Sequence, residues 1–492
     1  MSATRLCSLL LAVAVLAVAC GADRGNEAPG NRAGGSGPPV TLRMGTADAT
    51  GIEVDEMEQF ARQVEDRSGG LVRIETIPGA AGADAVEWNQ VVARKVADGE
   101  LEMGLVPSRA WDTEGVTTLR ALQAPFLVTS DELAAEIAGS DLADEMLAGL
   151  EQDGVVGLAL VPEGMRHLFS FRGPILDPAD LSGATVRVPK SETSFAFFEA
   201  LGAIPDDLGG PGDRFAAGVA SGEVAAAESS FLFAANMPAP ATVTGNLTLY
   251  PKVDTIVINA AVFGNLSDEQ KEMLRSAAGA TRDWAVGATT PDATLAQQLC
   301  GQEDVRVVAI GEAAAAAFAD AARPVYDQLE QDQSTAEMIG AIRKMSSQLP
   351  PPTPVEPCQP NFDLAPPVEG DPADLAAFPD GVYRVEISDQ DLVAFMPEIS
   401  QQDIDDNHGI WTWTLSDGHY SIDQRAPGYN WGAAGRFEVS GDRITFYLSW
   451  VDDFPATFTW RPDGGRLDFQ LVGDLHPILN ATFTAHPWKK IG

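Results

Sequence analysis

Arg187 is a charged residue in a place where a charge needs an explanation. It lies between Val186 and Val188, in a short apolar run that is typical of a buried strand. A guanidinium can form two parallel, charge-assisted hydrogen bonds to a carboxylate, and burying it without a partner is costly. Arg187 is therefore a candidate for binding an anionic ligand. The alternative is an ion pair with one of the chain's many carboxylates.

Two more residues could contribute to the same binding site. Arg166 is a candidate second donor to the anion, and an ion pair at the surface or between parts of the fold is the alternative. Trp111 could form part of the wall of the site, although single aromatic residues more often belong to a core.

The sequence lacks the common motifs of catalysis and metal binding. It contains no G-x-S-x-G, H-E-x-x-H, Walker or C-x-x-C pattern. Asp403, Asp405 and Asn407 have the spacing at which a calcium loop begins, but the glycine comes one position late and no Glu closes the loop. This stretch is interpreted as a solvated acidic turn. We therefore expect neither an enzyme nor a protein with a cofactor or metal.

Composition limits the class of protein and its partners. The 492 residues include 32 Lys and Arg against 71 Asp and Glu, giving a formal net charge of -39. Such a chain repels phosphate backbones, which argues against nucleic-acid binding. Its hydrophobic and charged fractions, 45% and 21%, are typical of folded proteins, and its length indicates two to four compact units.

The first residues have the features of an export signal. Arg5 is followed by an apolar stretch over 6–19, which is short for a membrane span, and then by Cys20 and Gly21. Small residues before such a cysteine resemble a lipobox, which implies cleavage before Cys20 and a lipid anchor on it. A plain secretory signal cut near Ala19 is the alternative. We expect a signal peptide at 1–19 and a flexible tether at 20–39.

The cysteines that would remain after export form an even pair. Cys7 would leave with the signal and Cys20 would carry the lipid, so Cys300 and Cys358 are left. In an oxidising compartment we expect them to form a disulfide, and two free thiols are the alternative.

Residues 40–349 alternate between strand-like and helix-like patterns, which predicts an α/β domain with mostly parallel sheets. The Thr129-x-x-Glu132 pattern and Ser267 indicate helix starts. Because about 310 residues exceed a typical single core, two lobes are expected. Strands are predicted at 40–44, 71–77, 101–106 and 155–161, and helices at 53–67, 85–98, 129–152 and from 268 towards Cys300.

The pattern changes after a proline-rich segment at 350–370, which indicates a semi-rigid linker. Within 371–492, Trp411, Trp413 and Leu415 alternate with Thr412 and Thr414, and similar runs follow. Seven or eight such strands predict a small antiparallel β-barrel similar in size and pattern to calycins, with a flat sandwich as the alternative. Its aromatic residues are expected to fill the interior rather than to hold an apolar ligand.

A series of short motifs resembles one protein family, the solute-binding proteins of TRAP (tripartite ATP-independent periplasmic) transporters. The resemblance extends over about residues 40–345. The motifs are, in order, Gln123-Ala124-Pro125-Phe126-Leu127, Gly164-Met165-Arg166, Pro178-Ala179-Asp180-Leu181-Ser182-Gly183, Arg187-Val188-Pro189, Leu201-Gly202-Ala203-Ile204-Pro205 and Glu228-Ser229.

The resemblance implies a two-lobed periplasmic-binding-protein-like domain whose hinge closes over a small organic acid. It implies that Arg187 binds the carboxylate and that Glu228 and Ser229 lie at the ligand. Ser229 takes the place of the family's usual Asn, and Ala225 to Ala227 depart from the motif that precedes it. The implied partners are TRAP membrane permease subunits.

A second hypothesis is a sensor or scaffold lipoprotein, in which a diverged binding domain presents the barrel to a partner. The additional barrel and the altered Ser229 turn motivate it. A secreted hydrolase would need a nucleophile with a partnered base, and none is evident in the sequence.

Overall fold

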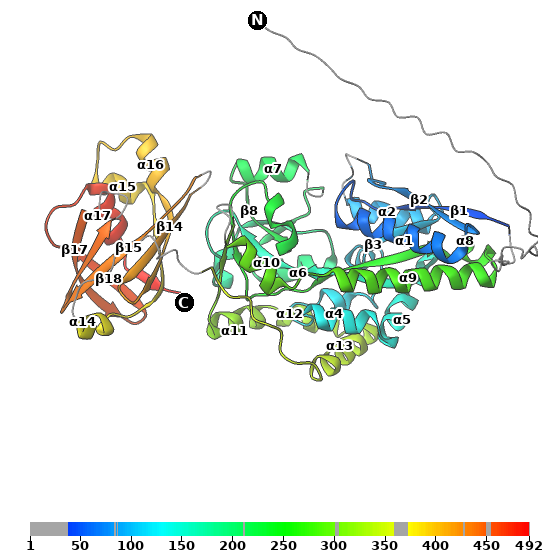
Figure 1. Cartoon of the computed structure of the whole chain (residues 1–492). Coiled ribbons are helices and arrows are strands. Elements are labelled where there is room, and N and C mark those ends of the chain that lie inside the picture. Colours follow the sequence, from blue (N-terminus) through cyan, green and yellow to red (C-terminus); the bar gives the residue numbers. More distant parts are fainter. Residues whose placement is uncertain are drawn as a thin grey trace, which may run out of the picture.

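The computed structural model describes residues 38–491, apart from 83–84, 86, 210–211, 301–304, 359–371, 427–428 and 449–453. The expected signal peptide, Cys20 and most of the tether lie outside the described residues, as does part of the expected linker. None of the described helices is long and apolar enough to cross a membrane. Two α/β lobes and a β-barrel follow one another in a row (Figure 1).

The first lobe is built on a five-stranded sheet of order β2-β1-β3-β10-β4. Strand β10 alternates its side chains between the two faces: Ile256 and Ile258 pack with α1 and α9, and Val257 packs on the opposite side. The strands are β1 (Val40–Gly45), β2 (Val72–Ile77), β3 (Met103–Pro107), β4 (Val155–Met165) and β10 (Pro251–Asn259). The helices are α1 (Ile52–Ser68), α2 (Trp88–Ala97), α3 (Ser108–Asp112), α4 (Asp131–Ala138), α5 (Asp141–Ala148), α8 (Ala260–Asn265) and α9 (Asp268–Ala288).

The second lobe is built on a six-stranded sheet of order β11-β9-β5-β8-β6-β7. Its strands are β5 (His167–Ser170), β6 (Thr185–Arg187), β7 (Ile204–Asp206), β8 (Val224–Ser229), β9 (Ala241–Thr244) and β11 (Val305–Val308). Its helices are α6 (Glu192–Ala200), α7 (Asp213–Ala220) and α10 (Asp292–Leu299). This two-lobed α/β architecture is the fold class that the sequence predicts.

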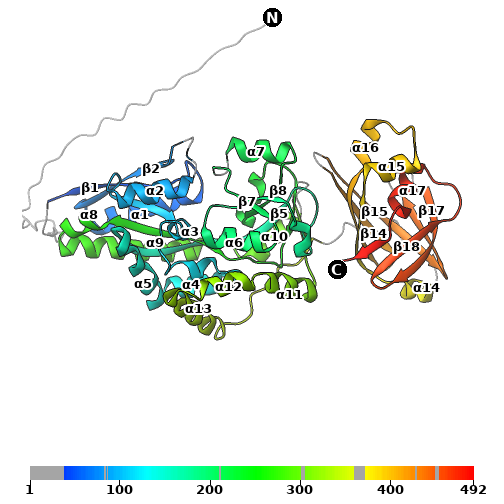
Figure 2. The ribbon, with the colours of Figure 1, turned by 180° about the vertical axis from the view of Figure 1, so that it is seen from behind.

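The chain crosses between the lobes where strands of the two sheets meet. Arg166 alone separates β4 from β5, its backbone N–H donates to the Tyr250 carbonyl, and the Leu249 N–H donates to the Arg166 carbonyl. The hinge strands are therefore paired with each other. Helices α11 (Glu312–Ala321), α12 (Arg323–Leu329) and α13 (Gln333–Ser346) run beneath both lobes, with α12 against α6 and α13 against α4 and α5 (Figure 2).

Three local expectations are corrected. The sheets are mixed, because strands at the crossings, such as β10 and β5, pair antiparallel. The helix predicted at 129–152 is divided between α4 and α5 at Gly139 and Ser140, since glycine is a poor helix former and the Ser140 hydroxyl donates to the Ile137 carbonyl. The cap of α4 is Ser130, one residue after the predicted one.

The C-terminal domain is a closed barrel of eight antiparallel strands, in which β12 pairs with both β13 and β19. The alternating pattern explains it: Trp411, Trp413 and Leu415 are buried inside. The strands are β12 (Gly381–Ile387), β13 (Gly409–Ser416), β14 (His419–Ala426), β15 (Tyr429–Ser440), β16 (Arg443–Leu448), β17 (Phe454–Asp463), β18 (Arg466–Leu471) and β19 (Trp488–Lys490). The helices are α14 (Pro372–Ala377), α15 (Asp389–Phe395), α16 (Gln401–Asn407) and α17 (Pro477–Thr484).

Aromatic side chains fill the barrel. Phe446 is fully buried and its ring contacts those of Trp413, Phe458 and Phe469, while Phe483 of α17 packs into the same group. The acidic stretch 403–407, predicted to be a turn, belongs to helix α16.

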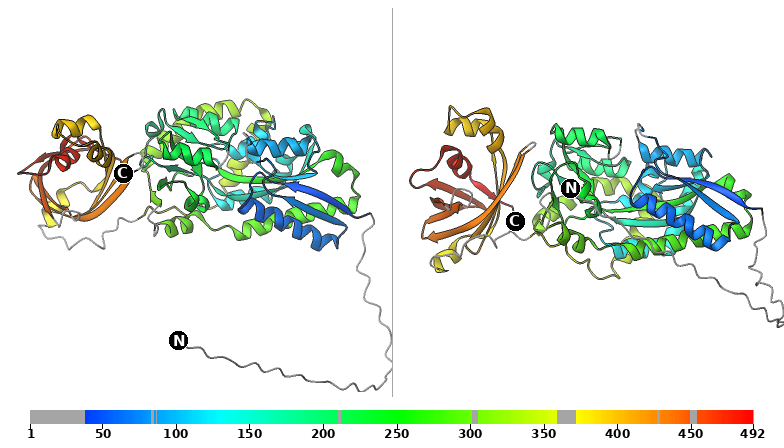
Figure 3. Two further views of the ribbon diagram at one scale, coloured as in Figure 1. Left: turned by 90° about the horizontal axis from the view of Figure 1, so that it is seen from above. Right: turned by 45° about the horizontal axis from the view of Figure 1, so that its top comes forward.

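The barrel contacts the second lobe (Figure 3). Arg384 of β12 forms an ion pair with Asp180 and donates to the Pro174 carbonyl, and Arg306 of β11 forms an ion pair with Asp423 of β14. The barrel is therefore held at the end of the molecule remote from the first lobe.

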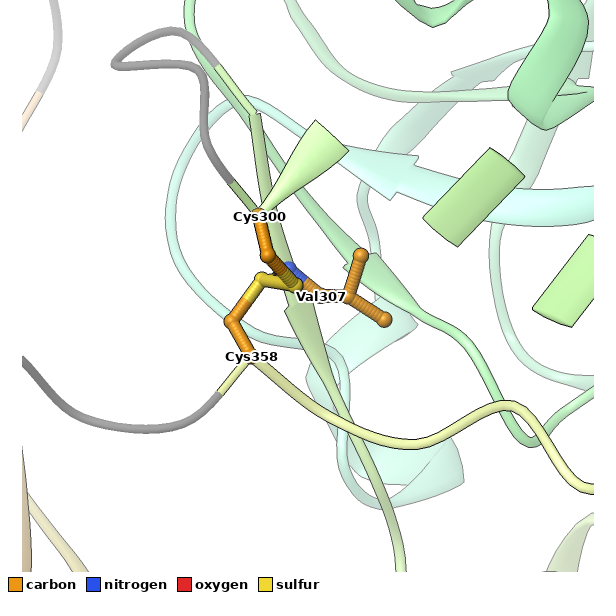
Figure 4. The surroundings of a disulfide bond; sticks show 3 residues. All are labelled: Cys300, Val307 and Cys358. Carbon is orange, nitrogen blue, oxygen red and sulfur yellow. Dashed lines mark hydrogen bonds between the residues drawn. A yellow bond between two sulfur atoms is a disulfide. The ribbon is translucent and has the colours of Figure 1, made fainter. Parts of the chain in front are cut away.

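Cys300 and Cys358 are joined by a disulfide across 58 residues. It joins the end of α10 to the segment that follows α13. Separate contacts hold this segment beside strand β11: the Val307 N–H lies 3.2 Å from the Cys358 Sγ, and the Cys358 N–H donates to the Val307 carbonyl (Figure 4).

Candidate functional site

Arg187 is a buried cation without a hydrogen-bond or ion-pair partner in the described part of the chain, and its guanidinium carbon lies 5.7 Å from the centre of the Phe215 ring. It ends β6, between β8 and β7, and is 8% exposed. Its guanidinium forms no hydrogen bond or ion pair there, and its Nε is buried. The pKa of Arg187 is lowered to about 10, mainly by burial; Glu228 opposes this fall, and Arg109 and Arg166 add to it. Arg187 therefore stays charged at neutral pH, and no carboxylate of the described residues forms an ion pair with it.

Arg109 is a second such cation, which the sequence reasoning missed. It lies on α3, directly after the buried strand β3, and is 6% exposed with an Nε that has no partner among the described residues. Its charge acts on that of Arg187 although α3 belongs to the first lobe and β6 to the second. The signal available in the sequence was an arginine followed by Ala110 and Trp111 straight after an apolar strand.

Arg166 forms the ion pairs that the sequence left as its alternative. Its Nη2 lies 3.0 Å from an oxygen of Glu163, and its Nε lies 3.4 Å from an oxygen of Glu228. Burial alone would lower the pKa of Arg166, but Glu228 and Glu163 outweigh it and raise the pKa. Arg166 therefore links the first lobe, through β4, to β8 of the second.

Lys252 of β10 continues this network. Its ammonium group forms ion pairs with Glu53 of α1 and Glu163 of β4, and lies 3.7 Å from Asp254. These three carboxylates are close enough together to hold a metal ion. The Lys252 ammonium already lies among them and forms ion pairs with two of them, Glu53 and Glu163.

Three further carboxyl groups of the network favour their neutral forms. Burial raises the pKa of Asp254 and of Asp48 to about 8, although Lys252 opposes the shift in both. Burial and the nearby Asp254 raise the pKa of Glu56 well above its usual range. At neutral pH Asp48 and Asp254 are mostly protonated, and a protonated carboxyl group can donate a hydrogen bond.

These residues form one cluster at the lobe boundary, which we call the inter-lobe charge cluster. Four cations face three ion-paired carboxylates in it, and that leaves an excess of one positive charge. The cations are Arg109, Arg166, Arg187 and Lys252, the ion-paired carboxylates are Glu53, Glu163 and Glu228, and the neutral carboxyls are Asp48, Glu56 and Asp254.

Of the remaining predicted ligand contacts, Glu228 belongs to the cluster and Ser229 follows it at the end of β8. Both are buried, and Ser229 pairs with His167 of the neighbouring strand β5. Trp111 is 1% exposed, and its indole N–H donates to the Thr255 hydroxyl in the core of the first lobe. Its side chain thus has a structural partner, and a role as a wall of the ligand site stays a prediction.

Comparison with known proteins agrees with this architecture. Crystal structures of TRAP periplasmic solute-binding proteins from Ochrobactrum anthropi and Roseobacter denitrificans superpose with a TM-score of 0.54 each, at 22% and 21% identity. They cover 63% and 62% of this chain, and 97% and 99% of their own chains. The second contains bound β-D-glucuronate. At this level of identity the likeness establishes the fold.

Curated relatives match over shorter stretches. The 2,3-diketo-L-gulonate-binding periplasmic protein of Escherichia coli is 26% identical over 149 residues, which are 30% of this chain and 44% of that protein. A solute-binding protein of Albidiferax ferrireducens is 24% identical over 54% of this chain and 78% of its own length. The chain thus spans less than half of the former relative.

The sequence model of one family matches residues 45–332, more than half of the chain and both α/β lobes. This chain therefore belongs to the family described as bacterial extracellular solute-binding protein, family 7.

Proposed function

We propose that the protein captures a small organic carboxylate between its lobes and that Arg187 binds the carboxylate group. The observation that carries this proposal is the buried, unpaired guanidinium of Arg187 at the lobe boundary. A bidentate carboxylate would replace the water that the guanidinium loses on burial. Arg109 is proposed as a second contact, because it is the other unpaired cation of the described cluster.

The inter-lobe charge cluster supports a ligand of one negative charge. A single carboxylate would neutralise its excess positive charge, whereas a dianion would leave a buried net negative charge. The neutral carboxyls Asp48, Glu56 and Asp254 would donate hydrogen bonds to hydroxyl or keto oxygens of the ligand. Sugar acids fit this description, and proteins that bind glucuronate or 2,3-diketo-L-gulonate are among the similar ones.

We further propose an extracytoplasmic location and delivery of the ligand to TRAP permease subunits in the membrane. Cys20 would carry the lipid anchor, Gly21 to Pro39 would be the tether, and 40–349, 350–370 and 371–492 would be binding domain, linker and barrel. The family match supports the location and the membrane partner.

Thermal unfolding of the chain from Gly21 onwards tests capture, with a panel of monocarboxylic sugar acids and C4-dicarboxylates. A bound ligand at 100 times its Kd should stabilise the protein by about 2.7 kcal/mol. We expect stabilisation by a monoanionic acid, lost in Arg187→Ala and retained in Arg73→Ala, which removes an exposed arginine of β2. No stabilisation by any acid, or equal stabilisation of both variants, contradicts the proposal.

The second candidate function is a sensor or scaffold in which the binding domain presents the barrel. The filled barrel interior favours it, because the aromatic core leaves the outer surface as the part that a partner would contact. If the acids do not bind, recovery of a specific protein partner by the isolated full chain, and its loss on deletion of the barrel, would support this function.

A further inference from the structure

A large cavity lies at the hinge, and no residue of the inter-lobe charge cluster lines it. Its volume is about 550 Å³, within the range of small-molecule sites. Met165 lines it, whereas the next residue, Arg166, points to Glu163 and Glu228. The hinge backbone at 165–166 therefore lies between this cavity and the inter-lobe charge cluster.

Parts of both lobes enclose this cavity, which we call the rear cavity. Its walls come from the first turn of α4, the hinge segment 245–248, the start of α10, helix α11 and the segment 351–355. The last segment crosses from α13, which packs on the first lobe, to Cys358, which the disulfide fixes to the second. The size and shape of the rear cavity therefore depend on how the two lobes are placed relative to each other.

The charged side chains that line the rear cavity are all acidic. They are Asp131, Glu132 and Asp292, and no Lys, Arg or His is among the lining residues. In the described part of the chain, the carboxylates of Asp131 and Glu132 form no hydrogen bond or ion pair. Burial, and then the like charge of Asp292, raise the pKa of Asp131 to about 7. When Asp131 is ionised, no cation of the described residues forms an ion pair with it.

His167 supplies a basic group next to one of these acids. Its Nε2 lies 2.6 Å from an oxygen of Asp292, and its ring is fully buried against Phe231. It lies behind Asp292 and does not line the cavity. One imidazole cannot balance three carboxylates, so the wall stays acidic.

The rest of the wall is uncharged and combines apolar side chains with hydroxyl and amide groups. Phe126, Ala315 and Pro351 belong to its apolar part, with further prolines of the same segment. Acidic residues beside an apolar stretch of wall fit a ligand with a cationic head and a hydrocarbon body.

We propose that the rear cavity binds a small organic cation, an amine or guanidinium with a short apolar body. The head would lie between Asp131 and Asp292, and the body against Phe126 and the proline segment. This site is separate from carboxylate capture and does not depend on Arg187.

Isothermal titration with agmatine and benzylamine tests the proposal at 0.15 M salt, where the chain's general negative charge is screened. We expect binding of at least one probe, weakened at least tenfold in the double variant Asp131→Asn and Glu132→Gln. The matched control is Asp144→Asn with Glu145→Gln, an exposed Asp-Glu pair on the neighbouring helix α5, where Asp144 also lies in the first turn. Binding of neither probe, or equal loss in both double variants, would overturn the proposal.

A variant that keeps the carboxylates guards against a folding defect. Ala315→Leu adds bulk to the half-buried wall of the cavity and should also weaken the probe at least tenfold. Arg187→Ala should leave the probe's affinity unchanged, so failure of the cation site and failure of carboxylate capture give different results. An unchanged affinity in Ala315→Leu would place the probe elsewhere and reject the rear cavity.

Discussion

Asp254 has the least satisfied carboxyl group of the inter-lobe charge cluster. Both of its oxygens are buried without a hydrogen bond, and Lys252 lies 3.7 Å away with closer contacts to Glu53 and Glu163. The pKa of about 8 follows mainly from burial. Because the folded state holds this proton more tightly than the unfolded chain, protonation of Asp254 stabilises the fold.

This carboxyl makes stability depend on pH in a defined direction. Its stabilising effect is complete below about pH 4, decreases as the pH rises towards 8, and is lost above it. The free energy of unfolding should therefore fall by on the order of 1 kcal/mol per pH unit between pH 6 and 8. Urea unfolding at several pH values should show a flatter dependence in Asp254→Asn. Asp144→Asn, an exposed control on α5, should keep the wild-type slope, and equal slopes in both variants would contradict this account.

Single residues also show where sequence reasoning reaches its limit. The apolar neighbours of Arg187 were enough to predict a buried cation, since burial is a local property of a strand. Whether such a cation is paired depends on residues far away in the chain. Arg166 forms an ion pair with Glu228, whereas Arg187 forms no ion pair with any described residue. Arg109 was missed because a five-residue helix leaves no periodic pattern.

At the scale of elements, alternation and caps predicted most strands and several helices, including the capping box of Ser267. The helix expected to run from 268 towards Cys300 ends at Ala288, and α10 begins after Pro291. Proline lacks the N–H that a continuous helix needs at this position. The closed barrel could be predicted from the sequence because most of its inner face is apolar or aromatic, whereas the order of the two α/β sheets depends on crossings with no local signal.

The disulfide is the covalent link between the segment after α13 and Cys300 at the end of α10. Closing a loop of 58 residues removes chain entropy from the unfolded state. We expect Cys358→Ser to lower the free energy of unfolding by about 2–4 kcal/mol, measured by urea denaturation. Wild-type protein treated with a reductant should lose the same amount, and reductant should have no effect on the variant. A variant as stable as the oxidised wild type would contradict this role.

The barrel interior makes a separate prediction. Phe446 is fully buried among six other rings, so Phe446→Ala leaves a cavity and should cost about 3–5 kcal/mol. Thermal unfolding should show that the barrel unfolds at a lower temperature than in the wild type. The affinity for the carboxylate ligand should be unchanged. Phe454→Ala removes a ring that is 42% exposed and serves as the control. Equal effects of the two substitutions would mean that the interior is not the source of barrel stability.

At the scale of the whole molecule, the barrel and the second lobe are expected to move as one body. The two ion pairs that join them, Arg384 with Asp180 and Arg306 with Asp423, are partly buried, and a cavity of about 250 Å³ lies between the domains. Hinge closure would therefore bring the first lobe towards a unit made of the second lobe and the barrel. The barrel surface is carried by the lobe that holds Arg187.

Removing both ion pairs should release the barrel from the second lobe. In the double variant Arg384→Ala and Asp423→Asn, the proline-rich linker becomes the main connection between the barrel and the second lobe. The interface between them contains a cavity, so few other contacts are left to hold the barrel in place. Small-angle X-ray scattering should then give a larger radius of gyration than in the wild type. Arg466→Ala, at an exposed arginine of β18, should not change it. If the double variant keeps the wild-type radius, apolar contacts around Ile491 and Val382 hold the barrel in place, and the rigid unit does not depend on charge.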